Sequence, residues 1–159
     1  SKLAEEARQR DERLEEPLPR PMLHSKDFNF SFAGLKTAVL YRLREMGKLG
    51  EEDKRKVASE FEDAVTEVLL KKTSAALKTS AAKTLAMGGG VAANKEIQRA
   101  FRALGEAQNG SVALLLPSPQ LTGDNAVMIA AAAYLRLAGG KKAAFQAPAE
   151  LSAAGNLRF

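Results

Sequence analysis

The sequence contains no cysteine and no tryptophan, and His24 is its only histidine. Without cysteine the chain forms no disulfide, no thiolate zinc site and no thiol nucleophile. A single imidazole excludes any site within this chain that needs two, including the His-Glu-x-x-His helix of zinc proteases. No uncharged apolar run approaches the roughly 18 residues of a membrane span, and the charge-rich start does not resemble a signal peptide. We therefore expect a cytoplasmic protein without a membrane partner.

What remains is the composition of a folded domain. Of 159 residues, 45% are hydrophobic and 27% are charged, and the formal net charge is +5. This balance argues against disorder, and the length suits one domain, or part of a larger one, with a buried core. The modest basic excess is compatible with a nucleic acid or nucleotide partner but does not require one.

The first 50 residues mix helical and extended patterns. Residues 1–13 alternate acidic and basic side chains, which predicts a helix with a solvated face. Three prolines within residues 17–21 exclude helix and enforce an extended linker. Three phenylalanines at a spacing of two in residues 28–32 place three rings on one side of an extended segment, where we expect core packing. A helix up to Gly47 follows, and we interpret residues 1–50 as a mainly helical and extended insertion.

The best-marked element is a helix over about residues 51–76. Its apolar residues recur with the helical period and predict one buried stripe. The stripe consists of Val57, Phe61, Ala64, Val65, Val68 and Leu69. Acidic residues at the start of the segment and lysines near its end suit the helix dipole.

The second half follows a strand–helix–strand–helix order. Residues 84–87 and 112–116 are short apolar strands, each followed by a loop and a helix, the last helix covering about residues 125–137. Continuous apolar strands that alternate with helices are typical of a parallel sheet covered by helices. Because two strands alone do not make a stable sheet, we expect residues 51–140 to be the later part of a larger α/β lobe. The tail, residues 141–159, has too little periodicity to assign.

The first candidate site is the segment Gly-Gly-Gly-Val-Ala-Ala-Asn at 88–94. A glycine turn from the carboxyl end of a strand into a helix exposes backbone N–H groups at the edge where open α/β sheets bind ligands. The pattern is neither the dinucleotide nor the Walker fingerprint. The Asn94 amide could hydrogen-bond a ribose or a base. The alternative is a tight turn that needs positive φ, with Asn94 as a helix-start residue, and both interpretations stay open.

The second candidate site is Thr-Gly-Asp-Asn at 122–125, which also follows a strand and precedes a helix. We expect it to face the same cleft. Asp124 could ligate a metal through hard oxygen atoms, or position phosphate through that metal. The commoner alternative is that Asp124 or Thr122 is an ordinary helix N-cap. One carboxylate is an incomplete metal site, so the other ligands would come from outside this chain. We expect His24 and Lys36 to be solvated surface residues.

Three separated segments together resemble one family. They are Pro-Arg-Pro at 19–21 with Phe-Asn-Phe-Ser-Phe-Ala-Gly-Leu-Lys-Thr-Ala-Val at 28–39, the glycine segment at 88–94, and Gly-Asp-Asn-Ala-Val-Met-Ile-Ala at 123–130. In this order they are similar to the C-terminal half of the bacterial TsaD family, the tRNA threonylcarbamoyladenosine transferases formerly labelled glycoproteases or O-sialoglycoprotein endopeptidases. The resemblance covers nearly the whole chain apart from the tail.

The resemblance implies an actin-like ATPase (ASKHA) fold, of which this α/β chain is the C-terminal part of a lobe. It implies transfer of a threonylcarbamoyl group from threonylcarbamoyl-AMP to N6 of the adenosine 3′ of the anticodon, in tRNAs that read codons beginning with A. Asn94, Gly89 and Gly90 would bind the nucleotide part of the substrate, and Asp124 would bind a divalent metal, usually iron. The implied partners are tRNA, a paralogous actin-like subunit and a small ATPase. No catalytic residue is assigned in this chain.

The chain also departs from the family pattern. The family's two metal-binding histidines and its phosphate-binding glycine segments lie upstream of the matching region, and Thr122 stands where many members have cysteine. We therefore expect this chain to supply about half of an active site and to be inactive alone. The alternative is a non-catalytic actin-like nucleotide-binding or scaffold paralogue, but the presence of Asp124 and Asn94 favours the catalytic member. A peptidase is disfavoured because no nucleophile–base pair or metalloprotease motif is visible.

Overall fold

The structure is a computed structural model that describes residues 2–140. The tail predicted at 141–159 lies outside the described residues. The elements are α1 (Lys2–Gln9), α2 (Ala33–Met46), α3 (Glu51–Ser80), β1 (Thr84–Ala86), the 3₁₀ turn η1 (Gly90–Ala93), α4 (Lys95–Glu106), β2 (Ala113–Leu115), the 3₁₀ turn η2 (Pro119–Leu121) and α5 (Ala126–Ala138). The chain divides into two compact units, Ser1–Thr122 and Gly123–Phe159. The domain boundaries expected from the sequence stay predictions.

The sheet of the first unit confirms the predicted parallel arrangement. β1 and β2 pair in parallel, with Leu85 opposite Leu114, and α4 connects them. The connecting helix packs closely on the second strand, since a Cβ atom built at Gly105 would lie 3.4 Å from the Cβ atom of Leu114. Among the described residues this sheet has two strands. The arrangement is compatible with an actin-like α/β lobe.

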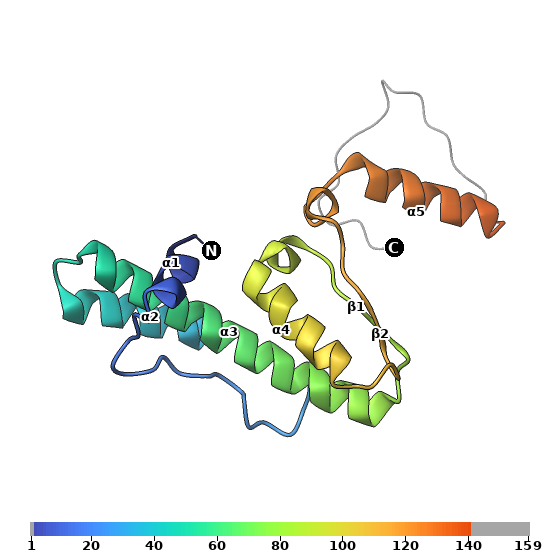
Figure 1. Ribbon diagram of the computed structural model, residues 1–159. Helices are drawn as coiled ribbons and strands as arrows, with labels where there is room; N and C mark the ends of the chain where they lie inside the picture. Colours follow the sequence, from blue (N-terminus) through green and yellow to red (C-terminus); the bar gives the residue numbers. More distant parts are fainter. Residues whose placement is uncertain (1, 141–159) are drawn as a thin grey trace. The chain divides into compact units, whose positions relative to one another are not determined.

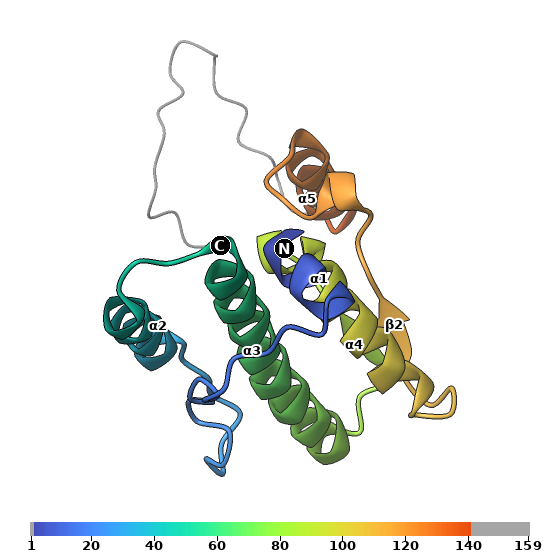
Figure 2. The ribbon, with the colours of Figure 1, turned by 60° about the vertical axis from the view of Figure 1, so that its left-hand side comes forward.

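The long helix α3 is the element on which the other helices of the first unit pack. It contacts α1, α2 and α4, as Figures 1 and 2 show. At its start the Asp53 carboxylate accepts a hydrogen bond from the backbone N–H of Gly50 over 2.9 Å. The helix continues past the predicted end at residue 76 to Ser80, because alanine and lysine in this stretch favour helix. Ala81 then ends it in the left-handed conformation, at φ +51°.

The N-terminal segment is more closely packed than its charge pattern predicts. In α1, Ala4 and Ala7 are fully buried, so this helix has a packed face as well as a solvated one. The proline-containing linker adds Leu18 to a core cluster with Leu35 and Ala64. The core is completed by the partly buried Leu14, Phe32, Val39 and Val65. The residues expected to form an insertion therefore cover part of α3.

The buried stripe of α3 is confirmed at Val57, Ala64 and Val68, but the prediction is wrong at Phe61, which is 41% exposed. Phe61 lines an apolar groove of about 890 Å³ together with Phe30 and Phe32.

The rings of Phe30 and Phe32 have centroids that lie 5.8 Å apart. Core packing of the phenylalanine ladder is also wrong for Phe28 and Phe30, which are about half exposed. Phe30 and Phe61 instead line the open groove, whereas α1 and the core cluster around Leu35 cover other parts of α3.

The second unit contains α5, which is largely apolar, with Arg136 as its one charged residue. Every side chain of this helix is exposed, and the most exposed include Ile129, Tyr134 and Leu135. A helix that is hydrophobic all round is normally buried in a larger protein. Among residues 2–140 no helix combines the length and the apolar character needed to cross a bilayer.

The core cluster predicts a position-dependent loss of stability in α2. Leu35→Ala should lower the free energy of unfolding by about 2–5 kcal/mol, because it leaves a cavity at a fully buried site. Leu40→Ala is the matched control, since the same substitution at a side chain that is 47% exposed should cost less than about 1 kcal/mol. Urea unfolding followed by circular dichroism measures both. Equal losses in the two variants would contradict the proposed core.

Candidate functional site

The glycine segment forms the predicted turn between strand and helix. The backbone N–H of Met87 still pairs with the carbonyl of Leu115, at 3.0 Å, one residue beyond β1. Gly89 then adopts φ +81°, a left-handed conformation that favours glycine. The chain continues through η1 to Asn94, whose N–H donates to the Val91 carbonyl over 3.0 Å. The expectation of a tight turn with positive φ is therefore confirmed.

The main chain of this turn is open to approach. A Cβ atom built at Gly88, Gly89 or Gly90 would meet no atom within 4 Å beyond its chain neighbours. Among the described residues, no backbone acceptor takes a hydrogen bond from the N–H groups of these three glycines. Exposed backbone N–H groups that precede a helix are suited to anions and to polar groups of a nucleotide. The turn can therefore bind a ligand through its main chain.

Asn94 is the N-cap of α4, so the helix-start interpretation is confirmed. Its Oδ1 atom accepts hydrogen bonds from the backbone N–H groups of Glu96 and Ile97, at 2.9 and 3.1 Å. Its Nδ2 atom donates to Oε1 of Glu62 over 2.6 Å. A side-chain amide carries two N–H donors, so one N–H of Asn94 has no acceptor among the described residues. Binding of a nucleotide by Asn94 stays a prediction, and this N–H is the group that would make it.

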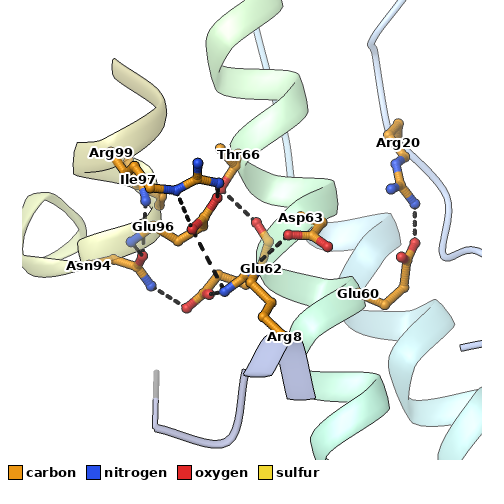
Figure 3. Close-up of polar contacts among 10 residues, drawn as sticks. All are labelled: Arg8, Arg20, Glu60, Glu62, Asp63, Thr66, Asn94, Glu96, Ile97 and Arg99. Atoms are coloured by element: carbon orange, nitrogen blue, oxygen red, sulfur yellow. Dashed lines mark hydrogen bonds and ion pairs between the residues drawn. The ribbon is translucent and has the colours of Figure 1, made fainter. Parts of the chain in front are cut away.

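Glu62 is a buried carboxylate that connects three helices (Figure 3). It lies on α3, is 6% exposed, and accepts from Asn94 at the start of α4. Its Oε2 atom accepts from the Arg8 guanidinium of α1 over 2.5 Å, and the same guanidinium donates to Asp63 over 2.5 Å. Burial acts to raise the pKa of Glu62, but hydrogen bonds, including those from Arg8 and Asn94, outweigh it and hold the pKa below its ordinary value.

The first turn of α4 adds a second carboxylate to this cluster. Glu96 accepts two hydrogen bonds from the Arg99 guanidinium, at 3.0 and 2.6 Å, and lies 3.9 Å from Arg8. The hydrogen bond from Arg99 outweighs burial and lowers the pKa of Glu96. Glu62 and Asn94 line a hollow of about 750 Å³ together with these charged residues, and they also line the apolar groove beside the glycine turn. The Asn94–Glu62 pair therefore lines two hollows, one among mainly charged residues and one among mainly apolar residues.

Asp124 belongs to the second unit and is exposed. The N-cap of α5 is Asn125, whose Oδ1 atom accepts from the backbone N–H of Met128 over 3.1 Å. The alternative that Asp124 or Thr122 caps this helix is therefore wrong. Within residues 2–140 no group of three or more His, Cys, Asp or Glu side chains could hold a metal ion. Metal binding by Asp124, with ligands from elsewhere, and its placement in one cleft with Asn94 stay predictions.

The remaining candidate residues are surface residues, as expected. Lys36 and His24 are exposed, and Nδ1 of His24 lies 3.1 Å from Nζ of Lys71. The sequence analysis missed Glu62 and Arg8. The available signal was a polar stripe at helical spacing, Ser59, Glu62 and Thr66, all of which are buried on α3.

Residues 1–131 match the sequence model of the TsaD family, described as tRNA N6-adenosine threonylcarbamoyltransferase. Curated relatives carry this same name. The protein from Thermosipho melanesiensis is 46% identical over 116 residues, which are 73% of this chain and 34% of that protein. The protein from Trichlorobacter lovleyi is 45% identical over 77% of this chain and 35% of its own length. That from Variovorax paradoxus is 46% identical over 77% and 34%. The chain thus spans about a third of the length of these relatives.

The carboxylate cluster predicts a pH dependence of stability. Because the pKa values of Glu62 and Glu96 are lower in the folded chain, both groups stabilise the fold above the ordinary glutamate pKa of about 4.3. This stabilisation is lost as the pH falls through their lowered folded-state pKa values. Glu62→Gln should therefore flatten the fall in unfolding free energy between about pH 6 and about pH 3. Glu15→Gln, at an exposed site, is the control and should leave the slope unchanged. An unaltered slope in Glu62→Gln would refute the role given to this carboxylate.

Proposed function

The chain belongs to the TsaD family of tRNA N6-adenosine threonylcarbamoyltransferases, and on this premise we propose the activity of the protein that contains it. The protein transfers the threonylcarbamoyl group from threonylcarbamoyl-AMP to N6 of the adenosine 3′ of the anticodon, in tRNAs that read codons beginning with A. One observation carries the proposal: the family match over residues 1–131 includes both the glycine turn and Asp124. Because the chain spans about a third of its relatives, it supplies part of the active site and is inactive alone.

The proposed architecture is the C-terminal part of an actin-like lobe. The order β1, α4, β2, α5 with parallel pairing supports it. A sheet of two strands is marginal by itself, and the apolar surface of α5 calls for further structure around it. Both features fit a segment of a larger lobe.

In the proposed site, the glycine turn and Asn94 bind the nucleotide part of threonylcarbamoyl-AMP. The open main chain at Gly89 and Gly90 allows close approach of ribose or phosphate. The second N–H of Asn94 is a donor suited to a ribose hydroxyl or a ring nitrogen. The apolar groove beside the turn, which Phe30 and Phe61 line, offers a surface for the base.

Asp124 is proposed as one ligand of a divalent metal, which in this family is taken to be iron. Its carboxylate is exposed, and Asn125 rather than Asp124 caps α5, so the carboxylate oxygens are not used for capping. Hard oxygen donors suit such an ion, and the remaining ligands would come from outside this chain. When bound, the metal would supply Lewis-acid polarisation of the acyl group or hold phosphate.

The partners proposed for the whole protein are tRNA, a paralogous actin-like subunit and a small ATPase. The proposed location is the cytoplasm, without contact with a membrane.

The second candidate function is that of a non-catalytic nucleotide-binding or scaffold paralogue. The capping role of Asn94 and its bond to Glu62 favour it, because a scaffold would keep both contacts without any substrate. Bound metal and product formation discriminate between the two candidates.

The proposed nucleotide contact predicts that Gly90→Ala in the full-length protein weakens AMP binding. A Cβ atom at this position meets nothing within 4 Å, so the fold should tolerate the methyl group. A nucleotide that approaches the main chain would collide with it, and we expect at least about a tenfold rise in Kd, or about 1.4 kcal/mol. Calorimetry measures the affinity, and the thermal midpoint checks the fold. Unchanged affinity with an unchanged fold would place the nucleotide elsewhere.

The metal assignment is tested with Asp124→Ala in the full-length protein. The variant should lose most of its bound metal, measured by mass spectrometry of the elements, and should no longer form threonylcarbamoyladenosine on a tRNA transcript supplied with threonylcarbamoyl-AMP. Glu106→Ala, which removes another exposed carboxylate, is the control and should keep both properties. Full metal content in Asp124→Ala would remove this residue from the metal site. A wild-type protein that forms no product would favour the scaffold.

A further inference from the structure

A side-chain donor that is already held in one orientation binds a ligand at a lower entropic cost, and the Asn94 amide group is held in this way. Its oxygen is fixed by the two backbone N–H groups of the α4 cap, at 2.9 and 3.1 Å. These bonds occupy the two acceptor positions of a carbonyl oxygen. The amide nitrogen is fixed separately, by its bond of 2.6 Å to Glu62. The second N–H of Asn94 is therefore the one group that this side chain offers.

Glu62 is suited to fix the nitrogen because it is itself held on both sides. One carboxylate oxygen faces Asn94, and the other accepts from Arg8 over 2.5 Å. Arg8 is in turn held by Asp63 on α3 over 2.5 Å. A carboxylate that is 6% exposed is tolerated because these donors compensate its loss of water. The carboxylate therefore has little freedom to turn away from Asn94.

The pair also lies where a ligand of the glycine turn would meet it. Glu62 and Asn94 line the apolar groove together with Gly88, Gly90 and Phe61. They also line the hollow that Arg8 lines. A nucleoside in the groove would thus meet the Asn94 amide, whereas the charge of Glu62 is compensated by Arg8.

We propose that Glu62 is a positioning residue for substrate binding, which holds the Asn94 amide so that its second N–H donates to the nucleoside part of the substrate. This inference rests on the proposed function, since it requires that Asn94 bind the nucleotide. Glu62 does not contact the ligand. Because Arg8 belongs to α1, the N-terminal segment supports the site through the same chain of contacts.

The test is a double-mutant cycle for AMP binding in the full-length protein, measured by calorimetry. Asn94→Ala and Glu62→Ala should each raise Kd by about tenfold, and the double variant should bind no more weakly than Asn94→Ala alone, since both remove one contact. Glu62→Gln should restore affinity to within about threefold of wild type, because its amide oxygen can still accept from Asn94. Glu67→Ala is the matched control, because Glu67 is another α3 carboxylate that pairs with an arginine, but its partner is Arg20 rather than Arg8, and its affinity should not change.

The outcomes separate the inference from the proposed function. Normal AMP binding by Asn94→Ala would remove Asn94 from the nucleotide site and would overturn both. The positioning role alone would be overturned if Asn94→Ala weakens binding while Glu62→Ala binds normally. It would also be overturned if the effects of the two substitutions add in the double variant. If Glu62→Ala does not fold, Glu62→Asp replaces it, since the shorter side chain keeps its charge but withdraws from Asn94. Normal affinity in Glu62→Asp would also overturn the positioning role.

Discussion

The buried carboxylate of Glu62 is the contact on which the arrangement of the first unit depends. Three helices meet at it, because it accepts from Arg8 on α1 and from the Asn94 cap of α4 while it lies on α3. A buried charge is costly when unpaired and acceptable when several donors surround it. The carboxylate therefore requires its partners, and the packing of α1 and α4 on α3 places them there.

The same contact gives the glycine turn a rigid end. The turn itself is open: Gly89 is left-handed, and no atom of residues 2–140 beyond the chain neighbours lies within 4 Å of a Cβ built at any of its three glycines. Its last residue, Asn94, makes four hydrogen bonds. Its backbone N–H donates to Val91, its side-chain oxygen accepts from two backbone N–H groups of α4, and its side-chain nitrogen donates to Glu62. An open loop that ends in a fixed polar side chain combines access for a ligand with a preorganised donor. That combination suits the nucleotide-binding role proposed for it.

The exposed apolar surface belongs to a chain that spans only part of the length of its relatives. The two-stranded sheet, the apolar groove along Phe61 and the largely apolar helix α5 leave hydrophobic side chains exposed. The chain spans about a third of the length of its relatives. A lobe completed by further strands and helices would bury such surfaces, as parallel sheets generally require cover on both faces.

Local patterns in the sequence determined the elements and the motifs. The helical period predicted α3 and the glycine run predicted a turn with positive φ, because each depends on neighbouring residues only. The strand–helix–strand order predicted the parallel pairing, because a helix is the usual crossover between parallel strands. The tertiary structure alone decided which side chains are buried and which polar groups meet. Phe61 has the period of a core residue but faces an open groove, and Asn125 rather than Asp124 caps α5. Arg8 and Glu62 stand 54 positions apart, and Asn94 follows 32 positions later. No local pattern encodes such contacts, because they arise only when α1 and α4 pack against the same stretch of α3.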